Sequence, residues 1–215
     1  MIVHDVKQGE SEWSRARLGI PTSSRFDSIL TPKTLKPAKG DGYLLELLTA
    51  WALGVSPNDG GSPWTQRGTD LEAEGRRAYS WETGADVAEV GFVTDDLGRY
   101  GASPDGLVGT DGLLEIKSPS AKAHIGYLID PDSLVQTYRC QVQGQIYVMR
   151  EEREWCDLYS CHYQDRPDRD ELPSVRVRVT LDPEWVEAFE PALATFFERL
   201  DEGKARLRSL GVDRD

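Results

Sequence analysis

GASPDGLVGTDGLLEIKSP, residues 101–119, is the stretch that decides the fold of this chain of 215 residues. Its second half alternates in the way that β-strands do, so Leu114 and Ile116 face one side while Glu115 and Lys117 face the other. A turn-forming GTDG segment precedes this strand. The stretch therefore predicts a strand with an apolar face toward a core and a charged face toward a site.

Asp105 is expected to come close to Glu115, because the turn between them folds the chain back on itself. Hard cations such as Mg²⁺ take oxygen ligands, and two converging carboxylates with a backbone carbonyl form part of such a shell. Lys117 would then orient or deprotonate a water molecule, or offset charge on a phosphate under attack. The alternative is that Asp105 belongs only to a turn and that Glu115 and Lys117 form an exposed ion pair.

Net charge argues against a nucleic-acid ligand unless basic residues cluster locally. The chain has 37 acidic and 25 basic residues and a net charge of −12, whereas a polyanion attracts a basic surface. Residues 31–40 and the C-terminal turns are the two basic clusters, and they contain Lys33, Lys36 and Lys39, and Lys204, Arg206 and Arg208.

The remaining composition is typical of a soluble single domain over residues 1–215, with 39% hydrophobic residues. No apolar run of about 18 residues predicts a membrane span. The first residues lack the pattern of a secretory signal, so we expect a cytoplasmic protein. Cys140, Cys156 and Cys161 form no CxxC pair, which favours reduced thiols over a disulfide framework or a zinc ribbon.

Hydrophobic periodicity predicts an α/β fold with a mixed central sheet flanked by helices. Helices are expected after residues 22–24, at 43–53, from about 70, after Pro119 (most strongly at 134–149) and from 183, with a turn-rich loop at 55–66. Strands are expected at 87–93, 100–102, 113–117, 155–162 and 175–180. Pro191 is expected to bend the last helix or to mark a boundary.

Ser-Pro-Asp-Gly at 103–106, followed by Glu-Ile-Lys-Ser-Pro at 115–119, resembles the active-centre motif of the PD-(D/E)xK nuclease superfamily. The likeness is strongest to the branch that contains phage lambda exonuclease and the YqaJ-type viral recombination nucleases, and it runs from about Gln8 to Gly211. It implies a restriction-endonuclease-like core. The implied parts are a mainly helical DNA-end-binding part (1–66), a catalytic core (67–182) and a C-terminal helix (183–215).

The resemblance also implies a metal shell made by Asp105, Glu115 and the Ile116 carbonyl, with Glu72 of RGTDLEAEGRRAYSWETG as a further acidic ligand. Two alternatives remain for that helix. In the first, Glu72 is part of a capping box with Thr69. Glu74 is a second candidate acid, and it projects from a different face.

Two further segments resemble family motifs. In QGESEWSRARLGIPTSS the resemblance implies that Arg17 grips a 5′ phosphate of the DNA end, assisted by Thr22 and Ser24. Hydroxyls at a helix start and a guanidinium are suited to that role. The alternative is that Ser23 or Ser24 only caps a helix and that Arg17 is a surface residue. In QTYRCQVQGQIYV it implies that Tyr138 and Gln141 approach the active centre, the alternative being an ordinary polar face.

Together these motifs imply an exonuclease that digests one strand of double-stranded DNA from its 5′ end with two Mg²⁺ or Mn²⁺ ions. The resemblance also implies a ring-shaped homotrimer that works with a single-strand annealing protein in phage recombination, inside a bacterial host. Two alternatives remain open: an endonuclease of the same fold, and a catalytically idle DNA-binding module.

Overall fold

The computed structural model describes residues 1–55, 63–162 and 172–212, and in its third α-helix it describes side chains from Leu71 onward. The strands form a three-stranded sheet, in the order β1-β3-β4, and a five-stranded sheet, in the order β2-β5-β6-β7-β8. The strands are β1 (Ile2–His4), β2 (Val87–Ala88), β3 (Phe92–Thr94), β4 (Gly101–Ala102), β5 (Gly106–Val108), β6 (Gly112–Lys117), β7 (Trp155–Ser160) and β8 (Val175–Thr180).

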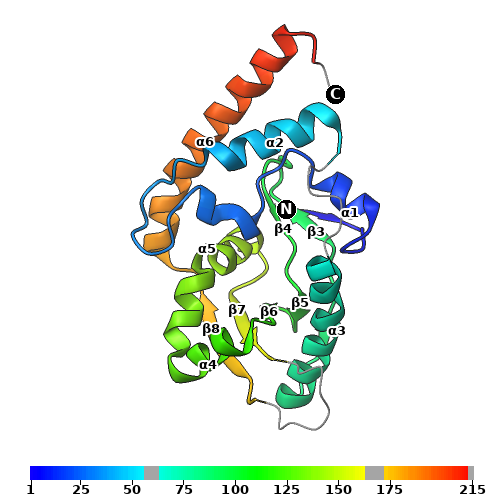
Figure 1. The fold of residues 1–215 in the computed structure, drawn as a ribbon, viewed down its shortest axis with the longest axis vertical. Helices are drawn as coiled ribbons and strands as arrows, with labels where there is room; N and C mark the ends of the chain where they lie inside the picture. Colours follow the sequence, from blue (N-terminus) through cyan, green and yellow to red (C-terminus); the bar gives the residue numbers. More distant parts are fainter. Residues whose placement is uncertain (56–62, 163–171, 213–215) are drawn as a thin grey trace.

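Helices surround the larger sheet and extend beyond it (Figure 1). They are α1 (Ser11–Ala16), the 3-10 helix η1 (Ser23–Ser28), α2 (Asp41–Leu53), α3 (Pro63–Thr83), α4 (Ala121–Ile129), α5 (Pro131–Met149) and α6 (Pro183–Ser209). Asp182 caps α6 by accepting a hydrogen bond from the Glu184 N–H at 3.0 Å, and Pro183 occupies the first helical turn. No helix in the described part of the chain is long and apolar enough to cross a membrane.

Strand β6 lies at the centre of the larger sheet, antiparallel to β5 and parallel to β7, so the sheet is mixed. Helix α3 covers one face and α5 the other (Figure 1). Leu114 and Ile116 pack on the α3 side with Tyr79, whereas Leu113 packs on the α5 side with Ile146. The predicted alternation is therefore confirmed, and it turns Glu115 and Lys117 toward α5.

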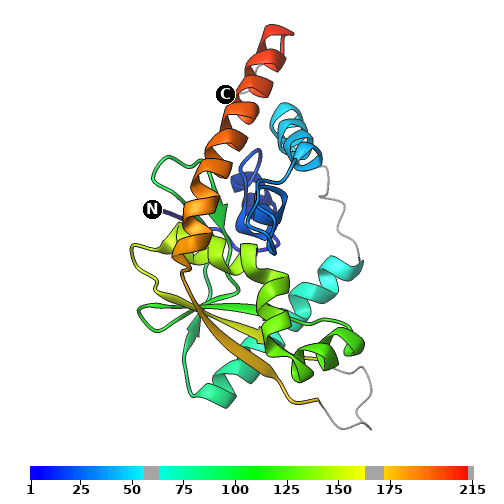
Figure 2. The same ribbon diagram turned by 90° about the vertical axis from the view of Figure 1, so that its left-hand side faces the viewer.

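A second core joins η1, α2, α5 and α6, and α6 runs outward along the long axis of the molecule beside α2 (Figure 2). Phe26, Trp185 and Phe189 are fully buried in it. Helix η1 lies close against α5 at Gly144, where an added Cβ would come within 2.4 Å of the Phe26 ring. The glycine thus permits the approach that places residues 22–24 beside α5.

The α/β class with a mixed sheet is confirmed, and so is strand 175–180. The expected start of the third helix near residue 70 is wrong, because α3 begins at Pro63. Residues 63–66 are therefore helical, whereas residues 56–62 lie outside the described part of the chain. Gly68 followed by Thr69 and Asp70 looks like a helix start in sequence, but the helix runs through it.

The single strand expected at 87–93 is also wrong, because β2 and β3 belong to different sheets. Gly91 lies between them, where an added Cβ would come 1.9 Å from the Val6 carbonyl oxygen. The N-terminal segment therefore crosses the chain at that point and separates the two strands. Pro191 lies inside α6 and marks no boundary. The sequence analysis did not identify β1, α1 or β5, and it treated α4 and α5 as one helical stretch after Pro119.

Candidate active site

The Glu115 carboxylate is buried, with 2% of the residue exposed, and it is surrounded by nitrogen donors. Its Oε1 accepts from Lys117 Nζ at 2.6 Å and from Gln141 Nε2 at 2.5 Å. Its Oε2 accepts from Gln145 Nε2 at 2.5 Å. The alternative interpretation, in which Glu115 and Lys117 form an exposed ion pair, is therefore wrong, since this carboxylate lies inside the protein.

Helix α5 supplies the amides because Gln141 and Gln145 are four residues apart and share one helix face. Gln141 also accepts from Lys117 Nζ at 3.0 Å through its Oε1, so it holds both members of the charged pair. Tyr138 lies one turn earlier, and Lys117 Nζ stands 4.6 Å from the centre of its ring. The face of α5 that faces β6 is thus a hydrogen-bonded part of the site and not an ordinary polar surface.

Asp105 joins this site through β6, as the turn predicts. Its Oδ2 accepts from the Ile116 N–H at 2.6 Å, and its own N–H donates to the Leu114 carbonyl at 3.0 Å. Burial raises the pKa of Asp105 well above its ordinary value, and the charges of Glu115 and Glu72 raise it further. The two carboxylates therefore lie close enough to repel each other.

Glu72 reaches the same site from α3, which lies close to β6 at Gly75; a Cβ there would come within 2.6 Å of Ile116. Burial raises the pKa of Glu72, and the charge of Glu115 adds to the rise. The capping-box interpretation is wrong, because Thr69 lies inside α3 rather than at its start. Glu74 is exposed and lies 4.0 Å from Arg77, so Glu72 is the acid that faces the site.

Lys117 is held as an ammonium ion in this arrangement. Burial alone would lower its pKa, but Glu115 and Asp105 outweigh that effect and raise the pKa above its ordinary value. A protonated lysine donates hydrogen bonds and offsets negative charge.

The residues present fit a divalent metal by charge and donor type. Three carboxylates, from Glu72, Asp105 and Glu115, face Lys117 and Arg76, which leaves excess negative charge and oxygen donors that hard cations prefer. In the part of the chain whose side chains are described, no three acidic, histidine or cysteine groups already form a metal shell. The Ile116 carbonyl remains a predicted ligand.

A second polar cluster gathers the three residues expected to bind an anion. Arg17 lies with its guanidinium carbon 3.9 Å from the centre of the Trp13 ring, and its Nη2 donates to Thr22 Oγ1 at 3.4 Å. Thr22 Oγ1 lies 3.3 Å from Ser24 Oγ. Burial lowers the pKa of Arg17 to about 10, and no carboxylate among the described side chains of residues 1–55, 71–162 and 172–212 forms a salt bridge with it.

The alternative in which these residues only cap a helix is not supported, because the N-cap of η1 is Thr22 and its side chain makes no cap hydrogen bond. Desolvated, and without a salt bridge to any carboxylate whose side chain is described, the Arg17 guanidinium has hydrogen-bonding capacity left for an anion. The structure thus brings Arg17, Thr22 and Ser24 together as the sequence predicted.

Short links join this cluster to the carboxylate site. Trp13 Nε1 donates to Ser103 Oγ at 2.9 Å, and Gln8 Nε2 donates to the Pro104 carbonyl at 2.9 Å. Both acceptors immediately precede Asp105 in the chain. The N-terminal segment is therefore fixed to the strand end that carries the first carboxylate. The sequence analysis assigned no role to Trp13 or Ser103, although both stand inside the motifs that it singled out.

Gln145 is another site residue to which the sequence analysis gave no role. It is completely buried, and the Cys156 Sγ lies 3.8 Å from its Oε1. Burial raises the pKa of the Cys156 thiol well above its ordinary value, so it stays protonated. Cys140, Cys156 and Cys161 are all buried, and no disulfide bond joins them to one another, as expected for reduced thiols. The only sequence signal for Gln145 was its spacing from Gln141.

Comparison with known proteins gives a consistent result. A family model described as "YqaJ-like viral recombinase domain" matches residues 12–152. LHK-Exo solved with dAMP is 33% identical, with a TM-score of 0.78, and the match covers 94% of this chain and 98% of that one. The alkaline exonuclease LHK-Exo from Laribacter hongkongensis is 31% identical over the same shares, with a TM-score of 0.76.

A phage-related exonuclease from Haemophilus somnus 129PT shares the fold, with a TM-score of 0.70 and 13% identity over 87% of this chain and 96% of that one. A search of the curated proteins found no match. These similarities agree with the restriction-endonuclease-like core that the 101–119 motif implied. The chain belongs to the family of YqaJ-like viral recombinase domains.

Proposed function

We propose that this protein is a metal-dependent exonuclease that digests one strand of double-stranded DNA from its 5′ end. One observation carries the proposal: the buried carboxylates of Asp105 and Glu115 lie beside Lys117, and the segment that carries Arg17, Thr22 and Ser24 is hydrogen-bonded through Trp13 to Ser103, just before Asp105. The similarity to alkaline exonucleases supports nuclease activity.

Asp105, Glu115, the Ile116 carbonyl and Glu72 would hold two Mg²⁺ or Mn²⁺ ions. Such ions, when bound, supply Lewis-acid stabilisation of the phosphate and activation of water. Lys117 would orient the water or offset charge on the phosphate. Gln141 supports that role because it contacts both Lys117 and Glu115.

Arg17, Thr22 and Ser24 would hold the 5′ phosphate and so set the direction of digestion. An endonuclease of the same fold needs no such pocket, so the pocket favours an enzyme that acts on ends. An idle DNA-binding module has no need for Asp105, Glu115 and Lys117 together. We also propose a homotrimeric ring around the DNA and action beside a single-strand annealing protein in phage-type recombination, in the cytoplasm of a bacterial host.

The pocket predicts that a 5′-phosphorylated duplex end is digested faster than a 5′-hydroxyl end. Arg17→Ala should reduce that preference by roughly tenfold or more, since a hydrogen bond to a charged group contributes about 1.5–3 kcal/mol. Initial rates on the two matched duplexes measure the effect. Arg15→Ala is the control, because Arg15 is exposed on α1. Equal wild-type rates on both ends would remove the pocket from the proposal.

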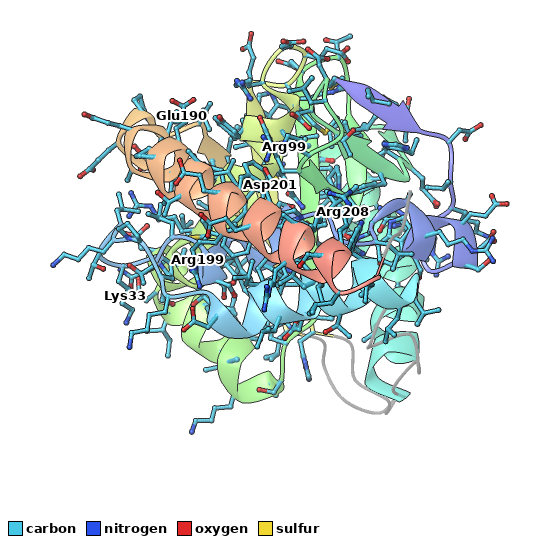
Figure 3. All side chains as sticks on the ribbon, turned by 90° about the horizontal axis from the view of Figure 1, so that it is seen from above. Lys33, Arg99, Glu190, Arg199, Asp201 and Arg208 are labelled. Carbon is cyan, nitrogen blue, oxygen red and sulfur yellow. The ribbon has the colours of Figure 1, made fainter. Side chains whose placement is uncertain are left out.

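The basic segment 31–40 is a second place where DNA is expected. It is a folded loop, since Ala38 N donates to the Ile29 carbonyl at 2.8 Å and Arg199 Nη1 donates to the Lys39 carbonyl at 2.6 Å. Lys33 extends outward at the edge of the molecule (Figure 3). The loop also contacts α5, where Arg139 donates to the Pro32 carbonyl at 3.3 Å, one residue from Tyr138.

Replacing Lys33, Lys36 and Lys39 by alanine should therefore weaken DNA binding and flatten its salt dependence, by up to about one unit of slope for each lost phosphate contact. Fluorescence titrations at several salt concentrations give the slope. Lys7→Ala is the control, because Lys7 already lies 3.5 Å from Glu10. An unchanged slope in the triple variant would mean that DNA lies elsewhere.

Light scattering at micromolar protein concentration tests the proposed trimer. The measured mass should be that of three chains, and a monomer would contradict the ring.

A further inference from the structure

The two oxygens of the Glu115 carboxylate have different surroundings. Oε1 contacts Lys117 and Gln141, and both of these side chains are partly exposed. Oε2 contacts Gln145, which is completely buried in α5. One oxygen therefore faces the accessible side of the site, and the other is held from behind by a residue with no route to solvent.

The Gln145 amide can hold a carboxylate in only one of its two orientations. Its nitrogen must point toward Glu115, because its oxygen would repel the carboxylate. At the other end of the amide, the Cys156 Sγ lies 3.8 Å from Gln145 Oε1 and offers it a weak S–H donor. Cys156 is also completely buried, on the neighbouring strand β7. The thiol thus favours the orientation that keeps the N–H on Glu115.

We propose that Gln145 is a positioning residue, which holds Glu115 Oε2 so that Oε1 is the oxygen presented to a metal ion, and that Cys156 fixes the Gln145 amide in the required orientation. This inference rests on the proposed function, because it concerns how this chain prepares one of its metal ligands. Outer residues that orient metal ligands commonly change metal affinity or activity by about 10–100-fold when they are replaced.

Gln143 provides a matched comparison on the same helix. It is also buried and also makes two hydrogen bonds, since its Nε2 donates to the Thr180 carbonyl at 2.9 Å and its Oε1 accepts from the Asp182 N–H at 2.7 Å. None of these partners is a carboxylate of the site. Gln143→Met therefore removes a buried amide of the same size without changing the surroundings of Glu115.

The test is calorimetric titration of Mn²⁺ alone into the DNA-free full-length chain. Gln145→Met should raise the dissociation constant of Mn²⁺ by about 10–100-fold. Gln143→Met should lower the melting temperature but leave Mn²⁺ binding within about twofold of wild type, because Gln143 bonds to the Thr180 carbonyl and the Asp182 N–H and to none of the proposed metal ligands. Gln145→Met should also cleave DNA more slowly than wild type at low Mn²⁺ concentration. Its cleavage rate should recover as the Mn²⁺ concentration is raised. Equal or tighter Mn²⁺ binding by Gln145→Met, or equal weakening in both variants, would overturn the inference.

Cys156 gives a second test that does not depend on the folding of Gln145→Met. Cys156→Ser keeps a donor and should bind Mn²⁺ as the wild type does, whereas Cys156→Val loses the donor and should bind it several-fold more weakly. The same affinity in both variants would contradict the role of the thiol.

If the wild-type chain bound no Mn²⁺ and cut no DNA, the proposed function would fail and this inference with it. If the wild type did both and only the Gln145 effect were missing, the inference alone would fail.

Discussion

Lys117→Ala is expected to lower the rate of DNA cleavage by about 10²–10⁴-fold, the range that a positioned proton-transfer or charge-stabilising group contributes. Its Nζ contacts Glu115 at 2.6 Å and Gln141 at 3.0 Å, so it lies at the centre of the proposed reaction. Its raised pKa means that the variant also loses a positive charge. Single-turnover rates on a linear duplex, at saturating Mg²⁺, measure the chemical step.

A second substitution separates this role from a general loss of charge. Lys122→Ala removes an exposed lysine from α4 and should leave the rate within about twofold of wild type, as expected for a surface change. Circular dichroism should show that Lys117→Ala remains folded. A folded Lys117→Ala variant that digests DNA at nearly the wild-type rate would exclude Lys117 from the reaction.

Asp105→Asn is expected to abolish cleavage and to stabilise the metal-free protein at neutral pH. Burial, and then the charges of Glu115 and Glu72, raise the pKa of Asp105 in the folded state. The folded chain therefore binds this proton more tightly than the unfolded chain does. The contribution of Asp105 to stability is fully present below its unfolded pKa and is lost as pH rises through its folded pKa.

An asparagine at position 105 does not ionise, so the variant does not lose stability as pH rises through the folded-state pKa of Asp105. Its side-chain oxygen can still accept a hydrogen bond from the Ile116 N–H. Denaturant unfolding in a chelating buffer should show a higher free energy of unfolding for the variant at neutral pH, with the two proteins converging as pH falls. For a chain of this size, each gain of 1 kcal/mol raises the melting temperature by about 2–4 °C. A variant that is less stable at neutral pH would contradict the proposed repulsion between the carboxylates. So would a difference that does not depend on pH.

The charged centre was predictable from sequence because its geometry is local. Strand alternation placed Glu115 and Lys117 on one face, and the turn before β6 brought Asp105 to the same strand. Helical spacing likewise placed Gln141 and Gln145 together. Each of these relations depends on a few neighbouring residues and on the fixed periods of strands and helices.

The parts that sequence did not predict depend on contacts between distant segments. The strand expected at 87–93 is interrupted because the N-terminal segment crosses at Gly91, and no local pattern encodes that crossing. Trp13 meets Ser103, and Cys156 meets Gln145, only after the sheets and α5 have assembled. The start of α3 was missed for a different reason: a Gly-Thr-Asp sequence that imitates a helix start is overridden by the helix in which it lies.

The most direct measurement of the central claim compares linear and circular forms of one duplex, each incubated with the wild-type protein and Mg²⁺. The linear duplex carries a distinct label at its 5′ and its 3′ ends. We predict that the 5′ label is released first, as a mononucleotide, that the circle stays intact, and that a chelator stops the reaction. Cutting of the circle as fast as the linear form, release of the 3′ label first, or no digestion in Mg²⁺ or Mn²⁺ would contradict a metal-dependent exonuclease that begins at 5′ ends.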